Sequence, residues 1–473
     1  MPLHRRTKII ATVGPACDSV EMLQKLIVAG VNIFRLNMAH GDLSSHSSRV
    51  YRIREAAEAS GMPVGILADL AGPKLRLGRL AVDPLECQAG DELLLTRGKV
   101  TTEPNVLVSE YEALLDEIQA GDRIIIGDGT VALEVRSSNS QQAECVVVDG
   151  GTIRGRQGIA LPNTRLSIET IGPKDYEHAD WATILNLDYV SLSFVRNQED
   201  IHQLRQFLKS KGSHAAIIAK IEKRESLDVL DEIVQAADGI MVARGDLGLE
   251  VDIATTAVVQ KRIIDSCRVE NKPVIVATQM LESMHHAKRP TRAEVSDVSN
   301  AILDGTDACM LSGETAVGQY PEDAVKMMSR IISEAERLVP ESILKARPDK
   351  SRHGDITEAV LQGATQISRG IGSQVVVVVT KSGRSAMLRS KLRDKTTTLC
   401  LTDSDKVAGQ ACLWWGVYPF HIDSVEDEGA ISAAISKWND MAGVINSGDR
   451  VVIVSDRRAY PQGHDSILVL EIP

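Results

Sequence analysis

The chain has 473 residues, of which 43% are hydrophobic and 25% charged, and its formal net charge at pH 7 is −11. This length exceeds what one hydrophobic core accommodates, so we expect two to four domains. The acidic balance and an aromatic content of 3% argue against a nucleic-acid partner, which needs basic surface and stacking rings.

The lack of a recognisable targeting signal and the pattern of the cysteines indicate a cytoplasmic protein. No apolar run approaches the length of a membrane span, and Pro15 and Asp18 make the first apolar stretch too short for a signal peptide. The seven cysteines are scattered and never form a Cys-x-x-Cys pair, which is typical of buried thiols in a reducing compartment. We therefore expect no membrane partner.

Short β-branched runs, each followed by helical periodicity, predict a parallel α/β architecture. The predicted strands are 7–13, 31–38, 63–70, 188–194, 215–221, 239–245, 273–278 and 308–312. The predicted helices are 20–29, 44–60, 197–211, 226–237, 255–270, 292–303 and 321–338. Eight such strands favour a closed (β/α)8 TIM barrel, which we assign to residues 1–72 and 163–340.

The insertion at residues 73–162 has a different pattern. Gly-Asp turns separate short alternating strands, which predicts a small β-barrel domain. It joins the larger barrel at Gly72-Pro73 and near Leu161-Pro162. Two such short connections favour a hinged lid that excludes water from an active site.

Residues 341–473 begin with a linker-like segment at 348–352 and continue as a separate α/β domain. A helix is predicted from Ile356, with strands near 375–380, 396–401, 417–422, 450–455 and 467–472. The first strand runs into a turn of small, hydroxyl and cationic residues: Thr380, Lys381, Ser382, Gly383, Arg384 and Ser385. This composition suits a bound phosphate, although many Ser-Gly turns only cap helices.

Charge is concentrated where two neighbouring predicted strands end. Lys220 and Glu222 lie two residues apart and so share one face of a strand, and Asp246 follows the next strand. Two carboxylates can hold a hard divalent cation, and a lysine beside a glycine-opened helix start suits a small anionic substrate. The pattern predicts phosphoryl-transfer or enolate chemistry.

Other predicted strands also end in polar residues, at the edge where barrel enzymes carry their chemistry. These residues are Arg35, Asn37 and His40, then Asp69, Ser193, Thr278, Ser312 and Glu314. Helix caps account for single residues of this kind but not for polar residues at so many strand ends at once.

These segments, in this order, resemble the pyruvate kinase family over nearly the whole chain. The resemblance rests on Thr7–Ala16, Arg35–Gly41, Asp69–Arg76, Ile217–Glu222, Met241–Glu250, Ala277–Met284, Arg289–Glu294 and Asp304–Thr315. It implies the barrel, lid and C-terminal domain, and transfer of phosphate from phosphoenolpyruvate to ADP, giving pyruvate and ATP in glycolysis.

The resemblance also implies roles for individual residues. Glu222 and Asp246 match the ligands of Mg²⁺ or Mn²⁺, while Lys220 and Arg35 match residues that contact the transferred phosphoryl group. The N–H groups of Gly245 and Asp246 would hold the substrate carboxylate. Thr278 matches a threonine near the enolate carbon. The nucleotide side would be formed by Asn37, His40 and Arg76.

One departure from the family concerns K⁺. Many members coordinate K⁺ at positions that are Asn37, Ala39, Asp69 and Leu70 here, so two oxygen-bearing side chains are missing. Lys74 stands where K⁺-dependent members carry a glutamate. We therefore expect an enzyme that works without K⁺, with the Lys74 ammonium in place of the ion.

Further resemblances and departures concern regulation and assembly. A lid lysine of many members is Gln157 here, with Arg156 beside it, and the segments 163–174 and 456–463 differ from the usual pattern. Residues 380–385 resemble a loop that binds effector phosphates, which implies a sugar-phosphate or nucleotide activator. Members are usually homotetramers, and Arg289–Glu294 resembles a subunit contact, so a homotetramer is expected by analogy.

Two other readings stay open. A Mg²⁺-dependent aldolase or lyase acting on pyruvate enolate would use Glu222 and Asp246 but leaves Lys220 and the lid unexplained. A non-catalytic homologue would bind effectors at 381–385, and the intact Lys220 and Thr278 argue against it.

Overall fold

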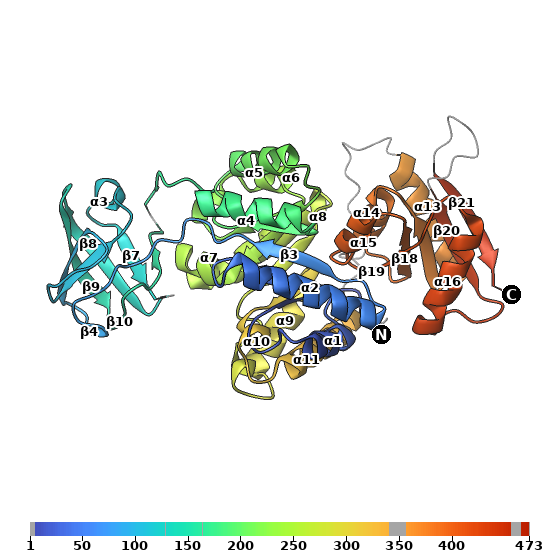
Figure 1. Ribbon diagram of the computed structural model, residues 1–473, viewed down its shortest axis with the longest axis horizontal. Helices are drawn as coiled ribbons and strands as arrows, with labels where there is room; N and C mark the ends of the chain where they lie inside the picture. The colour runs from blue at the N-terminus through green and yellow to red at the C-terminus, as the bar shows by residue number, and fades with distance from the viewer. Residues whose placement is uncertain (1–4, 128, 163, 340–355, 456–464, 473) are drawn as a thin grey trace.

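The computed structural model describes residues 5–127, 129–162, 164–339, 356–455 and 465–472. Three bodies follow one another along the long axis of the molecule, as Figure 1 shows. The barrel is central, the insertion projects from one of its ends, and the C-terminal domain packs against the other. The predicted linker at 348–352 and the segment 456–463 lie outside the described residues.

Within the described residues, eight parallel strands close a ring in the order β1-β16-β15-β14-β13-β12-β3-β2. They are β1 (Lys8–Thr12), β2 (Ile33–Asn37), β3 (Gly65–Asp69), β12 (Tyr189–Leu192), β13 (Ala216–Ile221), β14 (Gly239–Ala243), β15 (Val274–Ala277) and β16 (Ala308–Leu311). The expected TIM barrel is confirmed, and every strand end lies within two residues of its predicted position.

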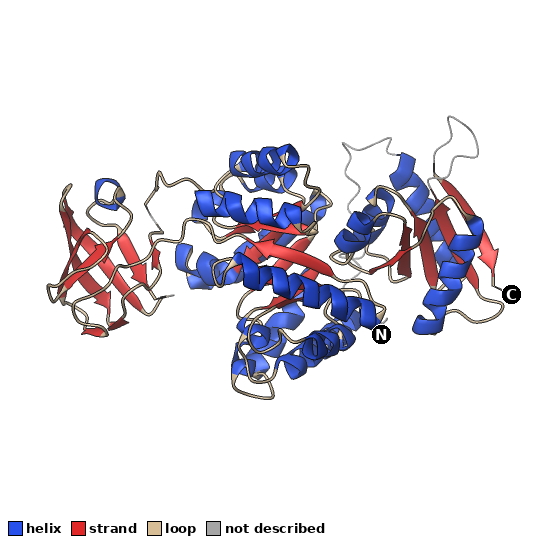
Figure 2. Ribbon diagram, in the orientation of Figure 1, coloured by secondary structure: helices blue, strands red, loops and turns tan. Residues whose placement is uncertain are grey.

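Helices cover the outside of this ring (Figure 2). They are α1 (Val20–Ala29), α2 (Leu43–Ser60), α4 (Pro173–Ile184), α5 (Gln198–Ser210), α6 (Leu230–Ala236), α7 (Arg244–Glu250), α8 (Ile253–Val269), α9 (Arg292–Asp304), α10 (Gly313–Ala316) and α11 (Pro321–Ala335), with 3-10 turns η1 (Arg224–Leu227), η2 (Glu282–His285) and η3 (Glu336–Leu338). Local signals set the boundaries of α1, where the Ser19 side chain caps the first turn and Gly30 at φ +122° ends the helix.

Three barrel helices lie outside the predicted helix ranges: α4, α7 and the short α10. A helix start was expected at Gly245 and Asp246, but α7 also contains Gly248, and both glycines lower helix propensity, so no helix range was assigned there. The start of α4 did carry a signal, since Pro173 occupies the first turn and the Asp175 carboxylate accepts from the Gly172 amide at 3.0 Å.

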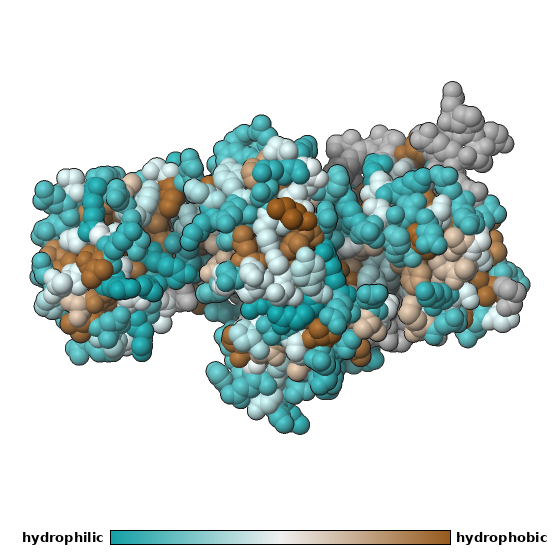
Figure 3. All heavy atoms as spheres, in the orientation of Figure 1, coloured by the Kyte–Doolittle hydropathy of each residue, from teal (hydrophilic) through white to brown (hydrophobic). Residues whose placement is uncertain are grey.

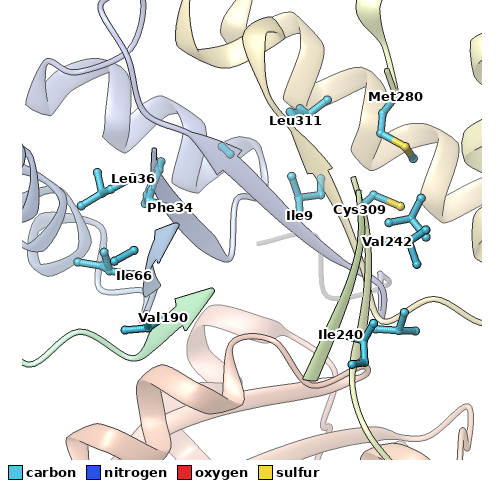
Figure 4. Close-up of a cluster of buried hydrophobic side chains, with 14 of the residues drawn as sticks. Ile9, Phe34, Leu36, Ile66, Val190, Ile240, Val242, Met280, Cys309 and Leu311 are labelled. Atoms are coloured by element: carbon cyan, nitrogen blue, oxygen red, sulfur yellow. The ribbon is translucent and has the colours of Figure 1, made fainter. Parts of the chain in front are cut away.

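The barrel strands bury both faces. Side chains on their outer faces pack against the helices, and Figure 4 shows members of this layer, among them Ile9 on β1, Phe34 on β2 and Val190 on β12. Side chains on the inner faces, such as Ile10, Leu67 and Met241, form a second core that continues into the C-terminal domain. This two-sided burial explains why the strands read as short continuous apolar runs.

The insertion surrounds its own core with two sheets. Its strands are β4 (Leu85–Cys87), β5 (Glu92–Arg97), β6 (Val106–Ser109), β7 (Arg123–Ile126), β8 (Val131–Ser138), β9 (Gln142–Asp149), β10 (Gly151–Ile153) and β11 (Ile159–Ala160), with the short helix α3 (Leu114–Glu117). The larger sheet has the order β11-β7-β8-β9-β5-β6, and β10 pairs with β4.

The C-terminal domain is a five-stranded sheet of order β19-β18-β17-β20-β21, in which only β21 is antiparallel among the described strands. Its elements are α13 (Ile356–Gly370), β17 (Val375–Val379), α14 (Arg384–Lys391), β18 (Thr397–Thr402), α15 (Asp405–Ala411), β19 (Val417–His421), α16 (Glu428–Ala442), β20 (Arg450–Ser455) and β21 (Ser466–Glu471). The expected α/β unit is confirmed.

This domain covers the amino-terminal ends of the barrel strands. Lys391 and Arg393 place their charged groups 2.8 and 2.9 Å from the buried carboxylate of Asp307, directly before β16. Tyr189 donates its hydroxyl to the Gln410 carbonyl at 2.5 Å. The opposite end of the barrel, where the strands terminate, therefore faces the insertion.

The surface in Figure 3 is largely hydrophilic, with hydrophobic side chains scattered among polar ones. None of the described helices is both long and apolar enough to cross a membrane. All seven cysteines are buried free thiols, as expected.

Candidate active site

The interior of the barrel changes from apolar to charged along the strands. Ile10, Ile33 and Leu67 belong to the inner core. Two residues further along the same strands, and so on the same inner face, stand Thr12, Arg35 and Asp69. The candidate site begins at this level.

Asp69 lies between two cations. Its Oδ2 accepts from Arg35 Nε at 2.7 Å and lies 2.5 Å from Nη2, while Oδ1 accepts from Ser191 Oγ at 2.6 Å and lies 3.3 Å from Lys220 Nζ. Burial opposes ionisation of Asp69, but Lys220 and Arg35 outweigh it and hold its pKa below the usual value. Arg35 is further fixed by Thr12 Oγ1, which accepts from Arg35 Nη1 at 3.0 Å.

Lys220 is the buried centre of the site. Its Nζ donates to Ser193 Oγ at 2.7 Å and lies 3.0 Å from Glu222 Oε1, in addition to its pairing with Asp69. Burial favours the neutral amine, but Asp69 and Glu222 raise the pKa of Lys220 above its usual value. The lysine therefore stays an ammonium at neutral pH.

Glu222 and Asp246 are near each other, as the sequence predicted. Burial raises the pKa of Glu222, Lys220 lowers it, and the charge of Asp246 raises it again. The other oxygen of Glu222 accepts from the Phe194 amide at 2.7 Å. A divalent cation between the two carboxylates would relieve their mutual repulsion, so these residues fit such an ion.

The site offers few protein ligands for a divalent cation. Among the described residues, no three His, Cys, Asp or Glu side chains form a cluster able to hold a metal. Two carboxylates nevertheless suit Mg²⁺, which usually keeps waters and takes further ligands from substrate phosphates.

Thr278 and Gly245 face each other across neighbouring strand ends. Gly245 N–H donates to Thr278 Oγ1 at 2.8 Å, and this hydroxyl donates to the Ala277 carbonyl at 2.6 Å. Thr278 and Gln279 have φ of +69° and +53°, a conformation that costs about 1–3 kcal/mol at a non-glycine residue and is frequent at active sites. Arg244 supports this turn, because its Nη2 donates to the Thr278 carbonyl at 2.8 Å while Nη1 pairs with Asp297 at 2.7 Å.

The residues expected on the nucleotide side are less closely connected. Asn37 Oδ1 accepts from the Ala39 amide at 3.2 Å, and Arg76 Nη1 donates to the Arg156 carbonyl at 3.2 Å. His40 is exposed. In the described part of the chain, no side-chain hydrogen bond or ion pair links Asn37, His40 or Arg76 to Lys220 or Glu222.

Lys74 stands between the insertion and the barrel rim. Its Nζ lies 3.4 Å from Asp246 Oδ1, and a Cβ added at Gly158 would meet its Cε at 3.0 Å. The expected substitute cation thus lies beside the candidate metal ligand and next to Gly158 of the insertion.

The loop Thr380–Ser385 joins β17 to α14, as expected. Thr380 Oγ1 accepts from the Gly383 amide at 3.1 Å, and Lys381 pairs with Glu426 at 2.6 Å. Ser382 and Arg384 line a cavity of about 610 Å³ between this domain and α5 of the barrel. A Cβ at Gly383, where φ is +79°, would meet the Trp414 ring at 2.7 Å.

Three site residues gained roles that the sequence did not assign. Asp69 was expected as a strand-end polar residue and a possible K⁺ position, Ser193 only as a strand-end polar residue, and Ser191 not at all. The sequence feature that could have identified them is a polar residue at every second position of a buried strand. This pattern places the residues on the inner face of the barrel but does not show what they contact.

Comparisons with known proteins agree with this geometry. Residues 4–325 match the family model for the pyruvate kinase barrel domain, and residues 358–470 match that for the pyruvate kinase alpha/beta domain. The pyruvate kinase of Thermotoga maritima is 38% identical over 469 residues, covering 99% of this chain and 100% of the relative. That of Geobacillus stearothermophilus is 37% identical over 478 residues, covering 99% of this chain and 81% of the relative. The crystal structure of a pyruvate kinase from Cryptosporidium parvum superposes with a TM-score of 0.92 at 35% identity, covering 99% of this chain and 97% of that one.

Proposed function

The chain belongs to the pyruvate kinase family, and from this premise we propose how its own residues transfer the phosphoryl group of phosphoenolpyruvate to ADP. The observation that carries the proposal is the buried Lys220 ammonium, which Asp69, Ser193 and Glu222 hold beside the Glu222–Asp246 pair. An ammonium in this position can follow a migrating phosphoryl group, because a compact point charge imposes no planar geometry.

Arg35 binds the same phosphoryl group from the β2 side. Its guanidinium is fixed by Asp69 and Thr12, so it needs little reorganisation when substrate arrives. Glu222 and Asp246 would hold Mg²⁺ or Mn²⁺, which, when bound, supplies neutralising charge at the phosphoryl oxygens.

The carboxylate of phosphoenolpyruvate would lie at the start of α7. The amides of Gly245 and Asp246 stand in its first turn, where helical N–H groups lack intrahelical partners. Gly245 N–H is bonded to Thr278 Oγ1, so the substrate either shares this donor or displaces the hydroxyl. Thr278 then lies beside the enolate carbon and relays a proton through water, since its own pKa is too high to supply one.

Asn37, His40 and Arg76 would contact ADP. The insertion would act as a lid over both substrates, with residues 73–162 as the moving domain and residues 1–72 and 163–340 as the fixed barrel. Residues 341–473 would form the regulatory domain, where Thr380, Lys381, Ser382, Gly383, Arg384 and Ser385 bind an activating sugar phosphate or nucleotide.

The enzyme would work without K⁺. Ala39 and Leu70 offer no side-chain oxygen at two of the four expected ligand positions, and both oxygens of Asp69 already accept from cations or a hydroxyl. Lys74 brings a permanent positive charge to the same rim. The assembly would be a cytoplasmic homotetramer.

ATP synthesis coupled to lactate dehydrogenase tests these proposals. The full chain is assayed with phosphoenolpyruvate, ADP and Mg²⁺, with and without K⁺, and with a panel of sugar phosphates. Pyruvate formed only when ADP is present supports the kinase. Enolate chemistry on pyruvate without ATP synthesis would favour the aldolase or lyase, and effector binding without turnover would favour a non-catalytic homologue.

A further inference from the structure

The loop of residues 193–196, directly after β12, contacts both connections of the insertion. On the first connection, Gly72 has φ +63°, and a Cβ there would lie 3.0 Å from both Ser193 Cβ and the Phe194 ring. On the second connection, residues 164–171 form no helix or strand, and Arg196 bonds to this segment. The loop therefore lies where the lid meets the barrel.

Arg196 bonds to the second connection through all three parts of its guanidinium. Nη1 donates to the Leu166 carbonyl at 2.7 Å, Nη2 donates to the Ile168 carbonyl at 2.7 Å, and Nε donates to Thr170 Oγ1 at 3.2 Å. These carbonyls have no sheet partner, so the arginine supplies the donors that a neighbouring strand would otherwise give. A planar guanidinium suits this arrangement, whereas an ammonium cannot reach all three acceptors in one plane.

The same loop also positions the candidate catalytic groups. Ser193 Oγ accepts from Lys220 Nζ at 2.7 Å, and Phe194 N–H donates to Glu222 Oε2 at 2.7 Å. Phe194 has φ +56°, a strained conformation for an aromatic residue that persists only where the surroundings determine it. The lid connections and the two charged groups thus share a support of four residues.

We propose that Arg196 is a positioning residue that sets the orientation of the lid relative to Lys220 and Glu222 through the 193–196 loop. This inference rests on the proposed function, because it assigns the lid and the two charged groups to one reaction. Arg196 touches no reacting atom. It holds the 166–170 segment against the loop, so that lid closure brings the nucleotide to a phosphoryl group already fixed by Lys220.

Two substitutions separate charge from geometry. Arg196→Met keeps the apolar stem and removes every donor, so the lid should close in more than one orientation. We expect kcat to fall about 10- to 100-fold, as misplacement of reacting groups by about 1 Å can cost a hundredfold. KM for phosphoenolpyruvate should change less than about threefold, because its phosphate-binding residues are intact. Arg196→Lys restores one donor and should recover part of kcat.

Arg205 provides the matched control. It has a similar exposure, 26% against 22% for Arg196, and also bonds to a backbone carbonyl and a carboxylate, those of Ala236 and Asp238. These contacts lie away from the lid. Arg205→Met should therefore lower thermal stability without lowering kcat.

The lid can be followed without turnover. Because all native cysteines are buried, dyes on Ser140→Cys at the lid tip and Glu58→Cys on α2 report the distance between lid and barrel. Arg196→Met should broaden this distance distribution, and Arg205→Met should not. An unchanged kcat or an unchanged distribution in Arg196→Met would overturn the proposal. The distance is informative even if the wild-type chain makes no ATP, which would instead reject the proposed function.

Discussion

Arg35 directs Nε and Nη2 at one oxygen of Asp69, at 2.7 and 2.5 Å, and leaves the other oxygen to Ser191 and Lys220. One carboxylate from β3 therefore orients the cations of β2 and β13 at the same time. In the proposed mechanism both cations act on one phosphoryl group, and their mutual repulsion is offset by the charge between them.

Replacing this carboxylate should impair catalysis and stability together. In Asp69→Asn the two cations lose their shared counter-charge, so kcat/KM for phosphoenolpyruvate should fall about 100-fold. Unmatched buried charge should also lower the free energy of unfolding by about 3–5 kcal/mol. Steady-state kinetics and urea denaturation measure the two effects.

Asp307 is the matched control for this substitution, because it too is buried between two cations, Lys391 and Arg393, but at the opposite end of the barrel. Asp307→Asn should lose comparable stability and keep kcat/KM within about threefold. Equal losses of activity in both variants would show that Asp69 acts through stability alone.

Lys220→Met should abolish turnover, with a loss of at least about 1,000-fold in kcat, because in the proposed mechanism the ammonium interacts with the transferring group itself. Lys8 is a second buried lysine of the barrel, and its Nζ donates to the Val417 carbonyl at 2.5 Å beneath the floor of the barrel. Lys8→Met should lower stability but retain turnover. Substantial ATP synthesis by Lys220→Met would remove this lysine from the mechanism.

The sequence predicted the barrel because its strands are short β-branched runs buried on both faces, with local punctuation such as Ser19 and Gly30 at the helix ends. It also predicted that Lys220 and Glu222 share a face, since this depends only on the period of a strand. It predicted the start of α7 at Gly245 and Asp246 but not its extent, because the glycines in this segment have a low helix propensity that the fold overrides.

Contacts between distant segments could not be predicted in this way. Asp69 meets Ser191 across 122 residues, and that pairing depends on barrel closure after the insertion, which places β12 beside β3. Likewise, Arg196 follows a predicted strand, but its acceptors lie in a segment without regular structure. Periodicity carries no information about such partners.

Asp188 should make stability depend on pH. Burial raises its pKa to about 7, although the Ile66 amide donates to it, whereas an unfolded aspartate has a pKa of about 3.9. Between these values the folded chain binds more protons than the unfolded chain, so the free energy of unfolding falls as pH rises through this window. Across the whole window, the free energy of unfolding should fall by up to about 4 kcal/mol.

The variant Asp188→Asn has no ionisable side chain at this position. As the pH rises from 5 to 8, its free energy of unfolding in guanidinium denaturation should fall less than that of the wild type. The carboxylate lies under α15, where a Cβ at Gly409 would meet it at 1.8 Å, so the loss should appear as weaker docking of the C-terminal domain. Asp440→Asn, at an exposed position of α16, should follow the wild type. Parallel pH profiles for wild type and Asp188→Asn would contradict the assignment.

The last prediction concerns Lys74 and K⁺. Its ammonium lies 3.4 Å from Asp246, and Ala39 and Leu70 remove two oxygens from the expected K⁺ position. The wild-type enzyme should therefore show the same rate in K⁺-free buffer, with tetramethylammonium holding ionic strength constant, as in K⁺. Lys74→Glu reverses the charge and adds a carboxylate, so its rate without K⁺ should fall about tenfold or more, a change of about 1.4 kcal/mol in the barrier. Added K⁺ should restore part of that rate.

The variant Lys74→Met removes the positive charge without adding a carboxylate, so it separates these two effects of Lys74→Glu. Its rate should be low with or without K⁺. Strong activation of the wild type by K⁺ would reject the substitution of ion by ammonium and leave Lys74 as a hinge residue that pairs with Asp246.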